Sequence, residues 1–261
     1  MQLLKLNDLI RIGRNYDGGY VIAESLMKRS SVLLSFGIND DWSFEEDFYQ
    51  KSGIRCLGFD FSIHKRIFLQ RTMQQIRFFI GDIIKRRRLG FDRWKEARRN
   101  YMLHVKFNSF FRKGEFQSYG IDNSTHGQFM TMDDILEKYL RGKNDIFLKV
   151  DIEGYEFRII DDILRNKDRF HTFAMEIHHI HDKDKGFFQF FEKIQQHFYV
   201  YHLHANNYGD LRQIDGYPDV IEISCIRKDL IDSPTFCENL SHLPIVNFDY
   251  PNDPASPDFK W

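Results

Sequence analysis

The chain is poor in cysteine. Its 261 residues include only three, Cys56, Cys225 and Cys237, and no two of them have CxxC spacing. An odd number of cysteines without metal-site spacing argues against a disulfide framework and against a structural zinc site. We therefore interpret the three thiols as packing or incidental residues.

Long hydrophobic runs are also missing. The longest apolar stretches, such as LLSFGI and DIFLKVDI, fall far short of the roughly 20 residues that a membrane-spanning helix needs. The start, MQLLKLNDLIRIG, lacks the charged and small-residue features of a signal peptide. We expect a protein without a transmembrane segment that stays in the cytoplasm.

Net charge is small, −1 at pH 7, but it is unevenly distributed. Between Lys85 and Lys113 eleven Lys or Arg residues face only Asp92 and Glu96. Such a block suits a phosphate-bearing substrate, an anionic membrane surface or nucleic acid, or it is a solvated helical face. Interleaved aromatic residues favour a packed basic helical insertion over 85–125, and we do not expect sequence-specific nucleic-acid binding.

Short apolar runs alternate with helical patterns along the chain. This order predicts an α/β fold with a doubly wound, mostly parallel sheet, because strands buried on both faces are continuously apolar. Expected strands are 31–36, 54–59, 76–80, 146–150, 173–177, 198–202 and 220–226, and expected helices begin near Asp41 or Ser43 and cover 132–139, 156–164 and 187–197. We expect a single domain, 1–261, with an extended tail over 243–261, where four of the six prolines lie.

Polar residues follow the expected strands, at the sheet edge where ligands bind in doubly wound folds. Gly37 and Asn39 follow the first strand, Asp60 and Phe61 the second, and Asp82 the third. The sequence lacks GxGxxG, which argues against a nicotinamide or flavin enzyme. Asp60 suits the hydroxyls of an adenosine ribose and Asp82 an adenine amino group. Alternatively, both carboxylates cap the helices that follow.

Five segments resemble one family in order along the chain. LKVDIEGYEFRII, Leu148 to Ile160, is similar to the signature of the FkbM-type methyltransferases, and RIGRNYDGGYVI, SFGINDDWSFEEDF, MEIHH and HLHANNYG resemble further blocks of that group. The resemblance implies a Rossmann-like class I methyltransferase fold and methyl transfer from S-adenosylmethionine. It also implies a hydroxyl acceptor on a sugar nucleotide or glycan, in surface polysaccharide (capsule) biosynthesis.

Roles for individual residues follow from strand ends and the resemblance together. We expect His178 as general base, with Asp151 as the second candidate. The expected cofactor-binding residues are Gly37, Asn39, Asp41, Asp60, Phe61, Asp82 and Asp151. The expected substrate-binding residues are Asp17, Tyr20, Glu153, Glu176, His179, His202, His204, Asn206 and Asn207.

Several alternatives remain open at this point. The histidines near Asp151 and Glu153 allow a divalent metal, although HExxH is absent and an HxH pair on a strand serves packing equally well. The rival functions are a non-catalytic cofactor-binding or scaffold module and a nucleic-acid methyltransferase that uses the basic insertion. The identity of the sugar and the existence of a homo-oligomer are also open.

Overall fold

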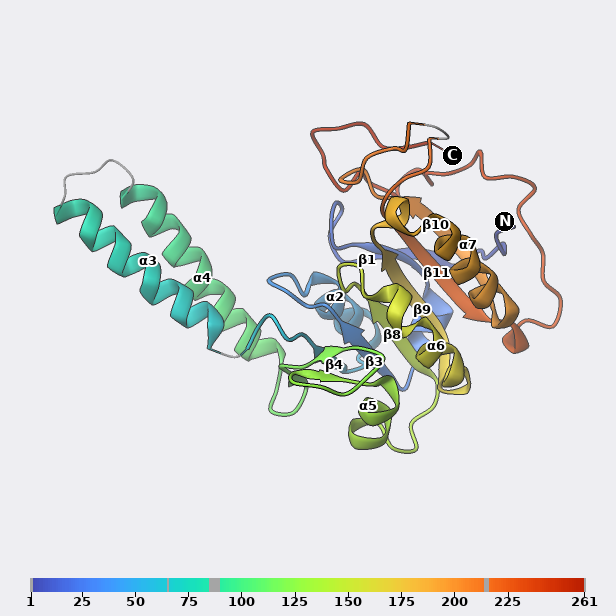
Figure 1. The fold of residues 1–261 in the computed structure, drawn as a ribbon, viewed down its shortest axis with the longest axis horizontal. Coiled ribbons are helices and arrows are strands. Elements are labelled where there is room, and N and C mark those ends of the chain that lie inside the picture. The colour runs from blue at the N-terminus through green and yellow to red at the C-terminus, as the bar shows by residue number, and fades with distance from the viewer. Residues whose placement is uncertain (1, 65, 85–89, 214–215, 261) are drawn as a thin grey trace.

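The fold is built around one large twisted sheet (Figure 1). In this computed structural model, residues 2–64, 66–84, 90–213 and 216–260 are described. The seven strands are arranged in the order β10-β11-β9-β8-β3-β4-β5. Their bounds are β3 Val32–Phe36, β4 Cys56–Phe59, β5 Phe116–Gln117, β8 Ile146–Val150, β9 Phe170–Ile177, β10 Phe198–Ala205 and β11 Ile221–Arg227.

Helices cover both faces of this sheet because alternate strand residues face opposite sides. Leu34 and Leu148 share one apolar cluster with α5 (Met132–Tyr139), α6 (Glu156–Arg165) and α7 (Ile180–His197). Leu33 and Phe147 join the opposite cluster, with α1 (Glu24–Arg29) and α2 (Ser43–Ser52). The mixed α/β architecture with a mostly parallel sheet is therefore confirmed, and it is consistent with a Rossmann-like arrangement.

Strand order reverses next to β3. The chain runs from β3 to β4 and β5 on one side, and later returns to β8 and β9 on the other, all of them parallel. β11 is antiparallel to both of its neighbours, β9 and β10. Because β3, β4 and β8 point the same way, the turns that follow them meet at one edge of the sheet.

The strand predicted over 76–80 is wrong. Those residues lie inside the helix α3, Ile67–Ile84, and the third parallel strand is instead β5. A five-residue apolar run such as IRFFI cannot be distinguished from part of a helix by its pattern alone. Here it continues an 18-residue helix that pairs with α4, Gly90–Phe110.

The α3–α4 hairpin extends away from the sheet as a long arm (Figure 1). Trp42, Phe68 and Phe107 anchor its base through ring contacts 5.4–6.1 Å between centroids. The helical excursion thus starts at Ile67, earlier than the insertion expected over 85–125, and it ends before β5. Lys85, Arg86, Arg87 and Arg88 lie outside the described residues.

Smaller elements complete the fold. β1 (Leu9–Ile12) and β2 (Tyr20–Ala23) form an antiparallel pair, and β6 (Gly120–Ile121) and β7 (Phe129–Met130) a short parallel one. Short 3-10 helices cover Lys167–Arg169 and Lys228–Leu230, and residues 231–260 contain neither helix nor strand. Among the described residues, no helix combines the length and apolarity that a bilayer crossing requires.

The other predicted elements are confirmed with shifts at their ends. Thr131 caps α5, because its side chain accepts a hydrogen bond from the Asp134 N–H. Asp41 accepts the Ser43 N–H at the start of α2. β9, β10 and α7 are longer than predicted.

Candidate functional site

A cavity of about 820 Å³ opens beyond the carboxyl ends of β3, β4 and β8. This is the edge at which the strand order reverses, and its volume is within the range of ligand pockets. The structure brings most of the expected site residues into its wall: Asp17, Gly37, Asn39, Asp41, Asp60, Phe61, Asp151, Glu153, Glu176, His178 and Asn206.

The turns after β3 and β8 touch at Gly37. Its φ is +77°, and a Cβ built on it would lie 1.6 Å from the Asp151 carbonyl oxygen. Only glycine fits there, because the left-handed conformation and the contact both exclude a side chain. Gly37, expected from the sequence as a cofactor-binding residue, therefore admits the Asp151 backbone.

Asp60 joins the turns after β3 and β4. Its Oδ2 accepts the Asn39 N–H at 2.7 Å, and its Oδ1 accepts the Ser62 N–H and hydroxyl at 2.7 and 2.6 Å. The carboxylate is 7% exposed and lines the cavity. Oδ1 already accepts two hydrogen bonds and Oδ2 only one, so Asp60 can shape the turn and still receive one ligand hydroxyl at Oδ2.

Lys149, which the sequence analysis missed, holds the Gly37 turn against Asp151. Its buried ammonium donates to the Gly37 carbonyl at 3.1 Å and to Asp151 Oδ2 at 3.2 Å. Although burial lowers the pKa of Lys149, the nearby carboxylates of Asp151 and Glu45 raise it above its usual value. The lysine thus remains charged. Its position in LKVDIEG, two residues before Asp151, was the available signal.

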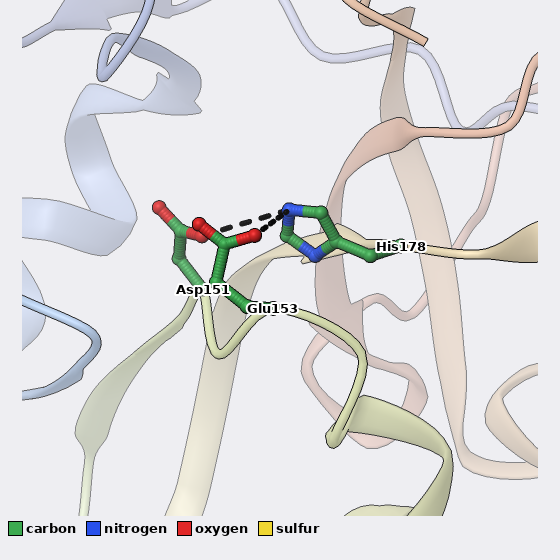
Figure 2. Close-up of side chains that lie close together, drawn as sticks. All are labelled: Asp151, Glu153 and His178. Carbon is green, nitrogen blue, oxygen red and sulfur yellow. Dashed lines mark ion pairs between the residues drawn. The ribbon is translucent and has the colours of Figure 1, made fainter. Parts of the chain in front are cut away.

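His178 faces a group of carboxylates at the end of β9. Figure 2 shows the Asp151 and Glu153 side chains turned toward its ring. His178 Nε2 lies 3.6 Å from Glu153 Oε2, 3.7 Å from Glu176 Oε1 and 4.0 Å from Asp151 Oδ1. His178 Nδ1 lies 3.1 Å from Oε1 of the buried Glu156, which also accepts backbone N–H groups of the β8–α6 turn.

These neighbours set the charge of His178. Burial lowers its pKa, but the hydrogen bond to Glu156 and the charges of Glu176, Glu156 and Asp151 raise it to about 10. The imidazole is therefore protonated at neutral pH. This differs from the near-neutral pKa on which the sequence argument for a general base relied.

The same side chains lie close enough together to hold a metal ion. Asp151, Glu153 and His178 each offer one ligand atom, and these atoms lie within 4.8 Å of one another. Oxygen and imidazole ligands of this kind suit a divalent cation. This part of the cavity therefore favours positive charge, whether on a protonated His178 or on a bound divalent cation.

Aromatic rings form another part of the wall. Phe61 and Phe129 lie 4.9 Å apart between centroids, and Phe129 stacks on Tyr155 at 5.9 Å with a 10° interplanar angle. All three line the cavity and suit a flat, partly apolar ligand such as a nucleobase. Of these three residues only Phe61 was predicted from the sequence, because it directly follows a predicted strand. Phe129 and Tyr155 do not, and the fold brings them to the cavity.

Several expected site residues lie elsewhere. Asp82 is on α3, where its Oδ2 pairs with Arg93 Nε at 2.5 Å, so the expected adenine contact loses its basis. Tyr20 is buried behind the cavity and donates to Asp151 or Glu176. His179 adopts a left-handed conformation at the start of α7 and packs on Gly154.

The expected polar wall of His202, His204 and Asn207 also needs correction. His202 Nε2 lies 3.0 Å from Asp249 Oδ1, and His204 Nε2 lies 3.1 Å from Asp258 Oδ1. Asn207 donates to the Asp253 carbonyl at 3.0 Å. These side chains bind the C-terminal tail, and of this segment Asn206, Tyr208 and Gly209 line the cavity.

The described part of the basic block also lies away from the cavity. Among its described residues, none of the Lys or Arg side chains between 90 and 113 lines the wall, whereas Arg14 and Arg71 do.

The fold and the cavity together indicate a ligand-binding site. In open α/β folds with a mostly parallel sheet, ligands bind at the strand-order reversal, where this polar and aromatic cavity lies. The family model described as "Methyltransferase FkbM domain" matches residues 107–210. Residues 107–210 are thus similar to this domain, which confirms the resemblance for the three segments inside the match, LKVDIEGYEFRII, MEIHH and HLHANNYG. No curated protein matches the chain.

The matched range extends from the base of α4 to the segment after β10. It includes Lys149, Asp151, Glu153, Glu176 and His178, whereas Gly37 and Asp60 precede it. The wall of the cavity therefore combines residues of the matched range with turns that precede it.

Proposed function

We propose that the protein transfers a methyl group from S-adenosylmethionine to a hydroxyl of a sugar, nucleotide-linked or glycan-linked, in surface polysaccharide biosynthesis. The observation that carries the proposal is the convergence of the turns at Gly37, Asp60 and Asp151 on one cavity. The strand order, with β11 antiparallel between β9 and β10, supports a class I methyltransferase arrangement.

The adenosyl part of the cofactor fits the side of Asp60. Asp60 Oδ2 accepts a ribose hydroxyl there, and Phe61, Phe129 and Tyr155 offer the adenine an aromatic surface to pack on. Asn39 and Asp41, after β3, contact the methionine part. The residues present therefore fit the cofactor in shape and in polarity.

The carboxylates near His178 fit the positive charge of a sulfonium. Bound there, S-adenosylmethionine supplies an electrophilic methyl group. Asp151, fixed by Lys149 and Tyr20, orients the reacting groups in line. His178, oriented by Glu156, accepts the proton of the hydroxyl once another positive charge near its ring lowers its pKa.

The acceptor sugar fits the remaining polar wall. Asp17, Glu153, Glu176 and Asn206 present carboxylate and amide groups that suit a hydroxyl-rich molecule. Arg71 and Arg14 are the cavity-lining cations that we assign to a phosphate of the acceptor.

The test is a transfer assay with methyl-labelled S-adenosylmethionine and a panel of sugar nucleotides and glycans. We expect label in an alkali-stable methyl ether together with release of S-adenosylhomocysteine. A protein that binds the cofactor but transfers to no acceptor would be a non-catalytic module. Label in RNA in place of the sugars would make it a nucleic-acid methyltransferase.

A further inference from the structure

The far end of the α3–α4 hairpin is an exposed apolar tip. We define the tip as the residues of the last turns of α3 and the first turns of α4 that carry large exposed side chains: Phe78, Ile80, Ile83, Ile84, Phe91 and Trp94. Ile84 is 75% and Phe91 67% exposed. A soluble surface rarely gathers so many large apolar groups without a partner.

The tip lies as far from the sheet as the hairpin reaches (Figure 1). Whereas Phe68 and Phe107 are fully buried at the hairpin base, the apolar side chains of the tip contribute little to the core. Their exposure therefore has no explanation in the packing of the domain itself.

Cationic side chains surround the tip. The Lys95 ammonium lies 4.5 Å from the centroid of the Phe91 ring, and the Arg93 guanidinium 4.9 Å from that of Phe78. Arg77 and Arg98 are exposed on the two helices. The sequence between Lys85 and Lys113 carries an excess of about nine positive charges, while the rest of the chain carries about ten negative ones.

We infer that the hairpin tip docks on an anionic lipid bilayer. Aromatic and aliphatic side chains next to Lys and Arg are the chemistry of the membrane interface, where rings enter the headgroup layer and cations meet lipid phosphates. The charge separation orients the molecule, because an anionic surface attracts the hairpin and repels the acidic body.

A bilayer explains this tip better than the other partners do. Binding of RNA through phosphates would not need exposed isoleucines at the end of the arm. A second copy of the chain would bring two basic hairpins face to face, although Met73, Tyr101, Met102 and Val105 continue the exposed apolar surface along the arm. The docking is interfacial, since neither of the two helices qualifies as a membrane span.

The experiment is vesicle co-sedimentation of the full chain without cofactor or acceptor, so it is independent of methyl transfer. We expect binding to vesicles of phosphatidylcholine and phosphatidylglycerol, weaker binding to phosphatidylcholine alone, and a blue shift of tryptophan fluorescence that is absent in Trp94→Phe. The double variant Ile84→Asn/Phe91→Asn should bind about ten-fold more weakly or less. The triple variant Arg77→Gln/Lys95→Gln/Arg98→Gln should lose a similar factor on anionic vesicles.

Val246→Asn is the matched control, because Val246 is 81% exposed but lies in the tail. Its vesicle binding should equal that of the wild type. The inference is overturned if the wild type stays in the supernatant, or if the tip variant binds like the wild type. It is also overturned if the tip variant converts a wild-type oligomer to a monomer, or if the charge variant loses RNA binding while vesicle binding persists.

Discussion

At the residue scale, Asp60 and Asp82 received similar roles from similar positions in the sequence, and the structure separates them. Asp60 closes the turn after β4 at the cavity, while Asp82 pairs with Arg93 in the hairpin. The two carboxylates therefore provide a matched pair of variants.

We predict that Asp60→Asn weakens binding of S-adenosylmethionine roughly 10- to 100-fold, since a hydrogen bond to a charged group contributes about 1.5–3 kcal/mol. Asp82→Asn should bind as the wild type does. Isothermal titration calorimetry gives both dissociation constants, and circular dichroism checks that each variant is folded. Equal affinities for the two variants would remove Asp60 from the cofactor site.

The protonation of His178 gives a second prediction at this scale. Because the surrounding carboxylates raise its pKa to about 10, an added positive charge in the cavity should lower that pKa toward neutrality. S-adenosylmethionine carries this charge and S-adenosylhomocysteine does not. NMR titration of the His178 ring should therefore show a lower pKa with the former ligand only; the same pKa with both would contradict the assignment of the sulfonium to this place.

Replacement of His178 should separate binding from chemistry. His178→Ala is expected to keep the cofactor dissociation constant within a few-fold and to lower kcat by about 100- to 10,000-fold, the usual contribution of general base catalysis. Transfer assays at saturating cofactor measure the effect. A variant with a wild-type kcat would show that another group takes the proton.

At the element scale, the strands of the sheet could be predicted from the sequence better than the α3–α4 hairpin could. Buried strands such as β8 and β9 are mostly apolar and are followed by polar residues, so their place and their ends can be recognised. Ile76 to Ile80 has the same local pattern but belongs to α3, where Phe79 packs on Trp94 of the partner helix while Phe78 and Ile80 stay exposed. Only tertiary contacts distinguish the two cases.

Among the site residues too, those at strand ends could be predicted from the sequence and others could not. Asp60, Asp151 and His178 lie at strand ends and were predicted, whereas Tyr155 and Phe129 reach the cavity from a turn and a two-residue strand. We predicted ligand contacts for His202 and His204 because nothing in the sequence of the tail, which has no pattern of regular structure, indicates that it covers them. Their true partners, Asp249 and Asp258, are about fifty residues away in the sequence.

The tail's attachment to the sheet should depend on pH. Burial lowers the pKa of His204, but hydrogen bonds to Asp258 and Glu222 raise it to about 10, above the value near 6.5 expected in the unfolded chain. Its contribution to stability is therefore fully present below about pH 6.5 and is lost as the pH rises through about 10.

Thermal unfolding of the wild type and of Asp258→Asn tests this link. The wild type should have the higher Tm near pH 6.5, and the difference in Tm between the two proteins should narrow toward pH 10.5. Each kcal/mol of unfolding free energy corresponds to about 2–4 °C in Tm for a chain of this size. A Tm difference that stays constant between pH 6.5 and 10.5 would show that the charges of His204 and Asp258 do not hold the tail.

At the scale of the whole molecule, the chain combines an acidic body that contains the cavity with a basic arm that extends from it (Figure 1). The methyltransferase match covers the half of the cavity formed by β8 and β9, and the Gly37 and Asp60 turns supply the other half. Under the proposed function, both halves of the cavity contact the same bound cofactor.

A crystal structure of the protein with S-adenosylhomocysteine tests this claim most directly. We predict density for the ligand in the cavity, with its ribose hydroxyls at Asp60 and its sulfur beside Asp151. Ligand density elsewhere, with the space between Gly37, Asp60 and Asp151 filled only by solvent, would contradict it.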